Sequence, residues 1–381
     1  MIHAPWDSAE LAAVVTSTGD TVLLRGGVTY SSSSVPTTLF SPSGVTLGMR
    51  GTGDRPVISG GLVNSAWTYD APNSVYASAP YATNVLGNVT EDGVPMKFVA
   101  WNTDIATTAA AMSSGQSLPA WSGSMTFNPT TRVLYVRPSS GLASQHVYVA
   151  SAVAGTTSGI VSSATSSNML IEDISLRSIS RHGILIYNKL NPIIRNVELL
   201  CIGGAKPSTL YMGNGIELSV GIRGAQVLNC LAADIFDSGF TSQLYEGTAA
   251  VAGDHYYEKN IVRRFGMHGI ELSVQTANQT LHDIEINGLQ AEDAGTYSWA
   301  GNRNGAAVTC LSNAINSSRV SRAFARDVVG SRMYRLYMGY QHGGVCGIED
   351  SKATGTWGQA PISSANGALS QRDLHRNVMD N

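Results

Sequence analysis

Short runs in which apolar and polar residues alternate recur through the middle of the chain, and each follows a glycine. The run NGIELS at Asn214–Ser219 returns as HGIELS at His268–Ser273, with a weaker copy, HGILIY, at His182–Tyr187. Alternation with a period of two is typical of a β-strand with one buried face. Five such runs start at glycines that lie 24 to 36 residues apart, namely Gly183, Gly215, Gly239, Gly269 and Gly305. This spacing is typical of the turns of a solenoid.

A second column of polar residues follows the same period. An Asp or Asn lies inside a further short apolar run of each turn, at Asp173, Asn196, Asn229, Asn260 and Asn287. Two columns in phase predict coils that stack in parallel, with a polar side chain at the same corner of every coil. We give this ladder a structural role, because stacked amides satisfy the backbone of the turns. The sequence therefore predicts an all-β chain folded as a right-handed parallel β-helix.

The remaining segments fit a single domain over residues 1–381. Residues 7–18 predict a short capping helix, because Asp7 can serve as its N-cap and Leu11, Val14 and Val15 share one face. Such a helix closes the open end of a solenoid. Residues 62–138 contain a predicted hairpin and are interpreted as a β-rich insertion packed beside the coils. Regular coils are expected over residues 168–355, followed by a polar C-terminal tail over 359–381.

Composition narrows the class of protein. Charged residues make up 13% of the chain, against about a quarter in most proteins, and glycine occurs 40 times. A net charge of −3 gives no electrostatic basis for binding nucleic acid or an anionic membrane. The chain has neither a run of 18 apolar residues nor a signal peptide at its start, so we expect no membrane insertion and no export signal. Its four cysteines lack metal-binding spacing, so we expect buried thiols, no metal and no other cofactor.

The glycine-centred runs also predict a polar surface on one sheet. Because Ile and Leu of GIELS point into the core, the residue two places after each glycine points outward. The outward column reads Leu185, Glu217, Thr241, Glu271 and Ala307, and the residues before the glycines are His182, Asn214, Ser238, His268 and Asn304. Since adjacent strands lie about 4.8 Å apart, these side chains should form one contiguous surface.

Carboxylates on this surface suit glycoside hydrolysis. Glu217 and Glu271 lie two coils apart, or about 10 Å at the backbone, and Asp237 lies on the coil between them. Inverting hydrolases hold their carboxyls about 6.5–9.5 Å apart and retaining ones about 5–5.5 Å. Glu217, Asp237 and Glu271 are therefore candidate acids and bases, and His268 is placed to orient water or stabilise charge. A purely structural interpretation stays open, in which the glutamates are solvated outward residues and the histidines cap tight turns.

Insertions on both sides of this surface carry aromatic residues that suit a carbohydrate. Tyr and Trp rings stack on the faces of sugars, while carboxylates and amides bond to hydroxyls. The candidate substrate-binding residues are His182, Asn214, Tyr211, Tyr256, Tyr257, Tyr297, Trp299 and Arg303. We expect an elongated glycan groove, although the tyrosines can instead pack the loops against the coils.

Two stretches of the chain resemble known proteins. The predicted helix followed by GDTVLLRGGVTY and GVTLGMRGTGDRPVISG, which span Gly19–Gly60, resembles the start of right-handed parallel β-helix proteins of the pectin-lyase-like superfamily that act on polysaccharides. The pair His268–Gly269 resembles the HG of polygalacturonases, and Asp237 lies near the position of their paired aspartates. The chain departs from that family, because it lacks the DD pair and the RxK motif, and its NTD at Asn102–Asp104 lies in the insertion. It is closer in style to phage tailspike glycan depolymerases, whose acids are placed more variably.

These observations predict a tailspike-type depolymerase that hydrolyses a bacterial surface polysaccharide. The resemblance implies a homotrimer, located in a phage tail or outside the cell, with other tail proteins as further partners. One alternative is a structural or receptor-binding tail protein that cleaves nothing. The other is a uronate lyase, for which the available groups are His255, Tyr256, Tyr257, Lys259 and Arg303.

Overall fold

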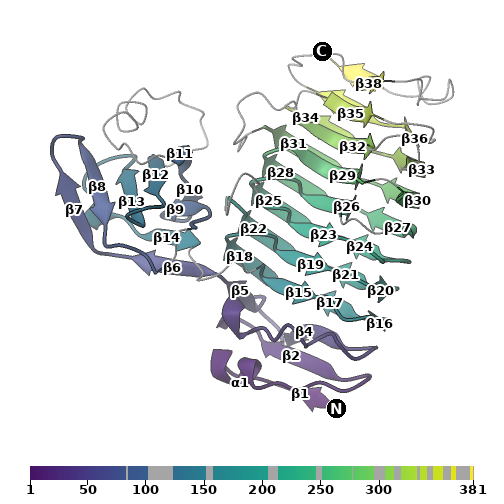
Figure 1. Cartoon of the computed structure of the whole chain (residues 1–381), viewed down its shortest axis with the longest axis horizontal. Helices are drawn as coiled ribbons and strands as arrows, with labels where there is room; N and C mark the ends of the chain where they lie inside the picture. The colour runs from purple at the N-terminus through teal and green to yellow at the C-terminus, as the bar shows by residue number, and fades with distance from the viewer. Residues whose placement is uncertain are drawn as a thin grey trace.

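Three long parallel sheets form the body of the protein (Figure 1). The computed structural model describes residues 1–82, 85–101, 123–151, 158–204, 213–245, 251–276, 278–295, 305–312, 319–332, 335–340, 346–354, 362–365 and 378–380. From β21 to β38 the strands enter the three sheets in rotation, so each coil contributes one strand to each sheet. This is the right-handed parallel β-helix that the glycine column and the Asp/Asn column predicted.

The first sheet contains β1 (Ile2–His3), β2 (Thr21–Arg25), β4 (Thr46–Arg50), β17 (Leu170–Glu172), β21 (Ile193–Arg195), β24 (Gln226–Leu228), β27 (Val251–Glu258), β30 (Thr280–Asn287), β33 (Arg319–Arg326) and β36 (Cys346–Glu349). The second sheet contains β3 (Thr29–Ser31), β5 (Val57–Ser59), β18 (Ser175–Ile179), β22 (Glu198–Ile202), β25 (Leu231–Ile235), β28 (Ile261–Phe265), β31 (Gln290–Ala294), β34 (Val329–Ser331), β37 (Lys352–Thr354) and β39 (Val378–Asp380). The third sheet contains β15 (Ile160–Ser162), β19 (Ile184–Ile186), β23 (Ile216–Leu218), β26 (Phe240–Leu244), β29 (His268–Val274), β32 (Ala306–Ser312), β35 (Arg335–Tyr340) and β38 (Ile362–Ala365). A short pair, β16 (Ser166–Ser167) and β20 (Lys189–Leu190), adds to the coils.

The glycine column stacks on the third sheet because neighbouring coils leave no room for a side chain. A Cβ on Gly215 would lie 2.4 Å from the carbonyl oxygen of Gly239, and one on Gly239 would lie 2.8 Å from that of Gly269. Beside this column the inward residues Ile216, Phe240 and Ile270 pair in register and are fully buried. Each buried apolar side chain of this size contributes about 1.5–3 kcal/mol to stability. The glycines thus set the register, and the apolar residues between them stabilise it.

The glycine column does not include Gly305, which the sequence had placed in it. Gly269 lies opposite Ala307, because His268 pairs with Ala306 and Ile270 with Val308. The predicted register is therefore wrong by two residues on this coil.

The corner between the first and second sheets needs one residue with left-handed backbone in every coil. Asp173, Asn196 and Asn229 hold it as predicted, with φ of 54°, 53° and 52°, and Asn and Asp tolerate this conformation well. In the next two coils the position belongs to Lys259 and Gly288, so Asn260 and Asn287 lie one place from it. The ladder then continues through Asp327 and Asp350.

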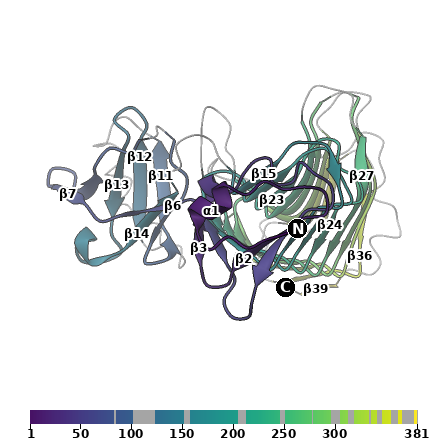
Figure 2. The ribbon, with the colours of Figure 1, turned by 90° about the horizontal axis from the view of Figure 1, so that it is seen from below.

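The N-terminal helix is shorter than the predicted segment 7–18. Helix α1 spans Ser8–Ala12, and the Asp7 carboxylate accepts hydrogen bonds from the backbone N–H groups of Ala9 and Glu10. Leu11 is buried, whereas Val15 lies beyond the helix and is exposed. Figure 2 shows α1 at the N-terminal end of the coils. A short 3₁₀ turn, η1 (Ser32–Ser34), packs against α1.

A lateral unit of mainly antiparallel strands, in which β11 and β12 pair in parallel, stands beside the coils (Figures 1 and 2). One of its sheets contains β6 (Gly61–Asn64), β9 (Val89–Glu91), β10 (Val94–Pro95) and β14 (Tyr148–Ser151), and the other contains β7 (Trp67–Asp70), β8 (Val75–Ser78), β11 (Lys97–Trp101), β12 (Ser124–Asn128) and β13 (Val133–Arg137). The predicted hairpin is the antiparallel pair β12–β13. The unit has its own apolar core and, with the 3₁₀ turn η2 (Ala143–Gln145), continues past residue 138 to Ser151.

Buried Asn88 joins the lateral unit to the coils. Its Nδ2 donates to the carbonyl groups of Cys201 at 2.7 Å, Gly203 at 2.9 Å and Ile179 at 3.3 Å. The carbonyls of Gly203 and Ile179 also accept the backbone N–H groups of Asn88 and Gly203, respectively. A single side chain therefore supports much of the polar contact at this junction.

The cysteines of the described segments behave as expected. Cys201, Cys230 and Cys310 are buried and form no disulfide. Burial raises the pKa of the Cys201 and Cys230 thiols to about 12. Among the described residues no helix is long and apolar enough to cross a membrane.

Candidate functional site

The third sheet brings two glutamates and their neighbours into one hydrogen-bonded network. Asn214 Nδ2 donates to Glu217 Oε2 at 2.9 Å, and Asn214 Oδ1 accepts the backbone N–H of Ser238 at 3.2 Å. Ser238 Oγ in turn donates to Glu271 Oε2 at 2.9 Å. His182 Nδ1 lies 3.0 Å from Glu217 Oε2. Side chains from four successive coils are thus connected, at positions that the sequence predicted.

The register places the two glutamates two coils apart, as predicted. Glu217 pairs with Thr241, and Thr241 pairs with Glu271. The strand spacing therefore separates the backbones of Glu217 and Glu271 by about 10 Å.

Burial of this network differs from the expected open surface. Glu217 is only 2% exposed, and His182 and Glu271 are each 7% exposed. Burying a carboxylate is costly unless it is paired and hydrogen-bonded, which explains why each glutamate has a polar partner. The network meets solvent mainly through His182 and Glu271, so a ligand would reach these residues first.

The contact between His182 and Glu217 requires one proton between two acceptor atoms. The imidazole Nδ1 and the carboxylate Oε2 are 3.0 Å apart, so the proton resides on one of them. Burial lowers the pKa of His182, which favours the neutral ring. The backbone N–H of Asn214 donates to the same Nδ1 at 3.3 Å, so Nδ1 is an acceptor and the proton of the 3.0 Å contact lies on Glu217 Oε2. A proton shared in this way can be delivered to a substrate by either group.

His268 belongs to the same surface but has a partner that the sequence missed. Its Nδ1 lies 2.8 Å from Thr309 Oγ1. Thr309 pairs with Glu271 and so occupies the outward position that had been assigned to Ala307. Ala307 instead lies opposite Gly269 and is buried, and Asn304 lies outside the described residues.

Asp237 lies on the coil between the two glutamates, one residue before Ser238. It is half-buried in the turn that joins β25 to β26, where its carbonyl group accepts the N–H of Met267 at 2.9 Å. Asp237 therefore lies on the predicted coil, but its place in the turn sets it to one side of the column formed by Glu217 and Glu271.

Three residues near Glu217 were not predicted from the sequence. The hydroxyl groups of Tyr187 and Tyr245 are 2.8 Å apart, and burial, together with the nearby Glu217, raises the pKa of Tyr245. Arg181 is half-buried, and burial lowers its pKa. The available signal was positional: Arg181 precedes His182 in the polar column, and Tyr187 and Tyr245 each follow a strand of the third sheet.

Two predicted substrate-binding residues belong elsewhere. The segment read as a loop forms strand β27 of the first sheet, and alternation along it directs Tyr257 into the core. The Tyr257 hydroxyl lies 2.7 Å from Ser242 Oγ, which also contacts His255 Nδ1 at 2.7 Å. Tyr256 faces outward on the first sheet, in register with Gln226. The prediction that these tyrosines line the groove is therefore wrong. The other predicted aromatic and basic residues, Tyr211, Tyr297, Trp299 and Arg303, lie outside the described residues.

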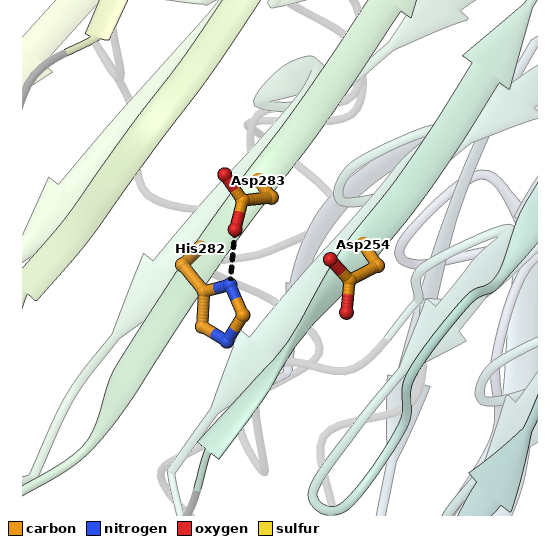
Figure 3. A group of neighbouring side chains, drawn as sticks. All are labelled: Asp254, His282 and Asp283. Atoms are coloured by element: carbon orange, nitrogen blue, oxygen red, sulfur yellow. Dashed lines mark hydrogen bonds and ion pairs between the residues drawn. The ribbon is translucent and has the colours of Figure 1, made fainter.

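One group on the first sheet has metal-ligand chemistry but is already neutralised. The ligand atoms of Asp254, His282 and Asp283 lie within 4.8 Å of one another (Figure 3). The Asp283 carboxylate accepts hydrogen bonds from Arg322, including one of 2.5 Å from Nη2, and contacts His282 Nδ1 at 2.7 Å. Arg322 and His282 together hold the pKa of Asp283 well below its usual range. Because Arg322 supplies the compensating charge, this group is an ion-pair cluster.

Comparison with solved structures shows the fold of this chain. A glycoside hydrolase has a TM-score of 0.55 at 8% identity, covering 95% of this chain and 88% of that one. An alginate lyase from Paenibacillus sp. str. FPU-7 has a TM-score of 0.48 at 10% identity, covering 99% and 95% of the two chains. An exopolygalacturonase from Thermotoga maritima has a TM-score of 0.41 at 10% identity, covering 100% and 91%. No protein-family profile and no curated protein matches the sequence.

The similarity to the glycoside hydrolase supports the fold described above. At such low identity it establishes the fold alone. The activity must therefore be argued from the residues of the third sheet.

Proposed function

We propose that this protein is a polysaccharide hydrolase whose catalytic residues are Glu217, Asp237, Glu271 and His268. The observation that carries the proposal is the buried network that links Glu217 and Glu271 across adjacent coils. Leu185 and Thr241 occupy the same outward column, so the coils can stack without an acid there. Two buried carboxylates add a desolvation cost that stacking does not require. Such a cost is typical of functional sites.

In this mechanism Glu217 is the acid and Glu271 is the base. The proton shared with His182 makes Glu217 the better donor to the glycosidic oxygen. Glu271, positioned by Ser238, would activate a water on the other side of the sugar. A backbone separation of about 10 Å suits inversion, for which the carboxyls lie about 6.5–9.5 Å apart. His268 would stabilise charge beside Glu271, and Asp237 would assist from the intervening coil.

Uronate elimination is the second candidate, and a specific group of residues favours it. Arg181 lies where it interacts electrostatically with Glu217, Tyr187 and Tyr245. A half-buried guanidinium can neutralise the carboxylate of a uronate, which makes the adjacent C–H more acidic. A tyrosine hydroxyl can then transfer the proton. In this alternative the cleaved glycan must be acidic.

The structural neighbours support a carbohydrate substrate only through their fold. By their descriptions they include glycoside hydrolases and lyases. As finer proposals, the protein is a tailspike-type depolymerase of a bacterial surface glycan, it forms a homotrimer, and it acts in a phage tail or outside the cell. Light scattering tests the trimer directly.

A glycan panel with two readouts tests the chemistry. New reducing ends without ultraviolet absorbance from an unsaturated product are expected for hydrolysis. Reducing ends accompanied by that absorbance would assign elimination instead. Binding to a glycan with neither product would overturn the enzymatic proposal and favour a receptor-binding role.

A further inference from the structure

A cleft at the N-terminal end of the first sheet lies outside the candidate site of the third sheet. The cleft has a volume of about 420 Å³ and lies between the segment before α1 and the ends of β2 and β4. Pro5 and Trp6 form one wall, and Arg25 and Arg50 form the other. Trp6 is 55% exposed, which is unusual for so large an apolar side chain.

The two arginines stand side by side on one face of the sheet. Arg25 pairs in register with Arg50, so their backbones are about 4.8 Å apart and both side chains point outward. Like charges placed opposite each other on neighbouring strands destabilise a sheet. In the described residues neither arginine forms an ion pair, and their guanidinium carbons lie 5.0 Å and 6.0 Å from the Trp6 ring centroid.

Outward arginines farther along the coils are arranged differently. Arg195 pairs with Glu172 on the preceding coil, and its Nε lies 2.7 Å from the carboxylate. Arg264 makes a two-point contact with Asp234 at 2.6 Å and 2.8 Å. The coils thus usually place an acid beside an arginine. Among the described residues the Arg25–Arg50 pair has no such acid, so its positive charge can bind an anionic group of another molecule.

Buried hydrogen bonds hold the walls of this cleft together. The hydroxyl group of the fully buried Tyr30 accepts the backbone N–H of Arg25 at 3.0 Å and donates to the carbonyl of Pro5 at 2.9 Å. The backbone N–H of Trp6 donates to the Glu10 carboxylate, which ties the segment before α1 to the helix. The cleft is therefore preformed, and a ligand need not order it.

We propose that this cleft binds an acidic sugar unit of a polysaccharide, at a site separate from the third sheet. Arg25 and Arg50 would bind the carboxylate of a uronate, and the indole of Trp6 would form the apolar wall against its ring. The volume suits one or two sugar rings. The net charge of −3 and the presence of only two cations in the cleft argue against a nucleic-acid strand. The site would hold the glycan without cleaving it.

Calorimetric titration with a uronate oligosaccharide tests this site independently of catalysis. The protein used carries Glu217→Gln and Glu271→Gln, so the proposed catalytic residues of the third sheet cannot cut the probe. Replacing both arginines by Gln should weaken uronate binding at least about tenfold. Trp6→Ala should weaken it about fivefold or more. Added salt should weaken it as well, because the contacts are exposed.

Three controls make the outcome decisive. Arg223→Gln removes one exposed charge from a later coil, where Arg223 bridges to Leu190 and Gly253, and should leave uronate affinity unchanged. Replacing Arg25 and Arg50 by Lys keeps both charges and should restore part of the binding. A neutral oligosaccharide of the same length should bind at least tenfold more weakly. The proposal is overturned if uronate does not bind at millimolar concentration, if the Arg-to-Gln pair and Trp6→Ala leave its affinity unchanged, or if Arg223→Gln weakens binding as much as they do.

Discussion

The substitution Glu217→Gln replaces a buried carboxyl group by an amide of the same shape. Asn214 Nδ2 and His182 Nδ1 both contact the same atom, Oε2, so glutamine keeps one contact at a time: its oxygen accepts from Asn214, or its amide donates to His182. The amide cannot act as a general acid, so proton transfer at this position is lost. Loss of a general acid lowers the rate about 10²–10⁴-fold, which corresponds to about 3–5 kcal/mol of transition-state stabilisation.

Stability should respond far less than activity. Glu217 is 2% exposed, so the loss of one buried hydrogen bond at Oε2 should cost about 1–3 kcal/mol. If Glu217 served only to hold Asn214 and His182 in place, the same destabilisation would appear with an unchanged rate. Steady-state kinetics on the cleaved glycan and thermal unfolding of the same samples measure both quantities.

Glu285→Gln is the matched control, because Glu285 is an exposed glutamate of the first sheet, 3.7 Å from Arg326. It should change neither quantity appreciably, since exposed pairs contribute about 0–1 kcal/mol. A Glu217→Gln protein that is destabilised by several kcal/mol and keeps its full rate would refute the catalytic assignment.

Three further substitutions test the fold around the site. Asn88→Ala removes the amide that donates to the carbonyls of Cys201 and Gly203 at 2.7 Å and 2.9 Å. The free energy of unfolding in urea should fall by about 2–5 kcal/mol. A fall below about 1 kcal/mol would mean that other contacts hold the lateral unit. Gly215→Ala would place a Cβ 2.4 Å from the carbonyl oxygen of Gly239 and should lower the free energy of unfolding by about 1–3 kcal/mol. Gly27→Ala is the control: its Cβ would have open space, so this substitution tests backbone strain alone. Burial lowers the pKa of His255 to about 4 from an unfolded value of about 6.5, so the unfolded state binds more protons and stability should fall by about 3 kcal/mol as the pH drops from 6.5 to 4. His255→Asn should flatten this slope in unfolding curves measured between those pH values, and an unchanged slope would assign the acid sensitivity to other groups.

The parts of the fold that follow from local sterics could be predicted from the sequence. The stacked glycines are one example, because the carbonyl of the next coil excludes any side chain at Gly215 and Gly239. The alternation of GIELS is another, since it places Glu217 and Glu271 in a common column. The error at Gly305 arose because an alanine, Ala307, takes the position opposite Gly269.

Features set by distant segments could not be predicted in this way. Burial of Glu217 depends on neighbours such as Tyr245, which follows a different strand. Tyr257 was assigned to a loop because its strand, Val251–Glu258, buries the polar residue His255 and so shows no clear alternation of apolar and polar residues. The contact between His268 and Thr309 required the true register of β32.

A crystal structure of the Glu217→Gln, Glu271→Gln protein with an oligosaccharide of its cleaved glycan tests the central claim most directly. The account predicts that the sugar lies across β23, β26 and β29, with a glycosidic oxygen within hydrogen-bonding distance of residue 217 or 271. An oligosaccharide bound only at other faces of the coils, with the third sheet unoccupied, would contradict it.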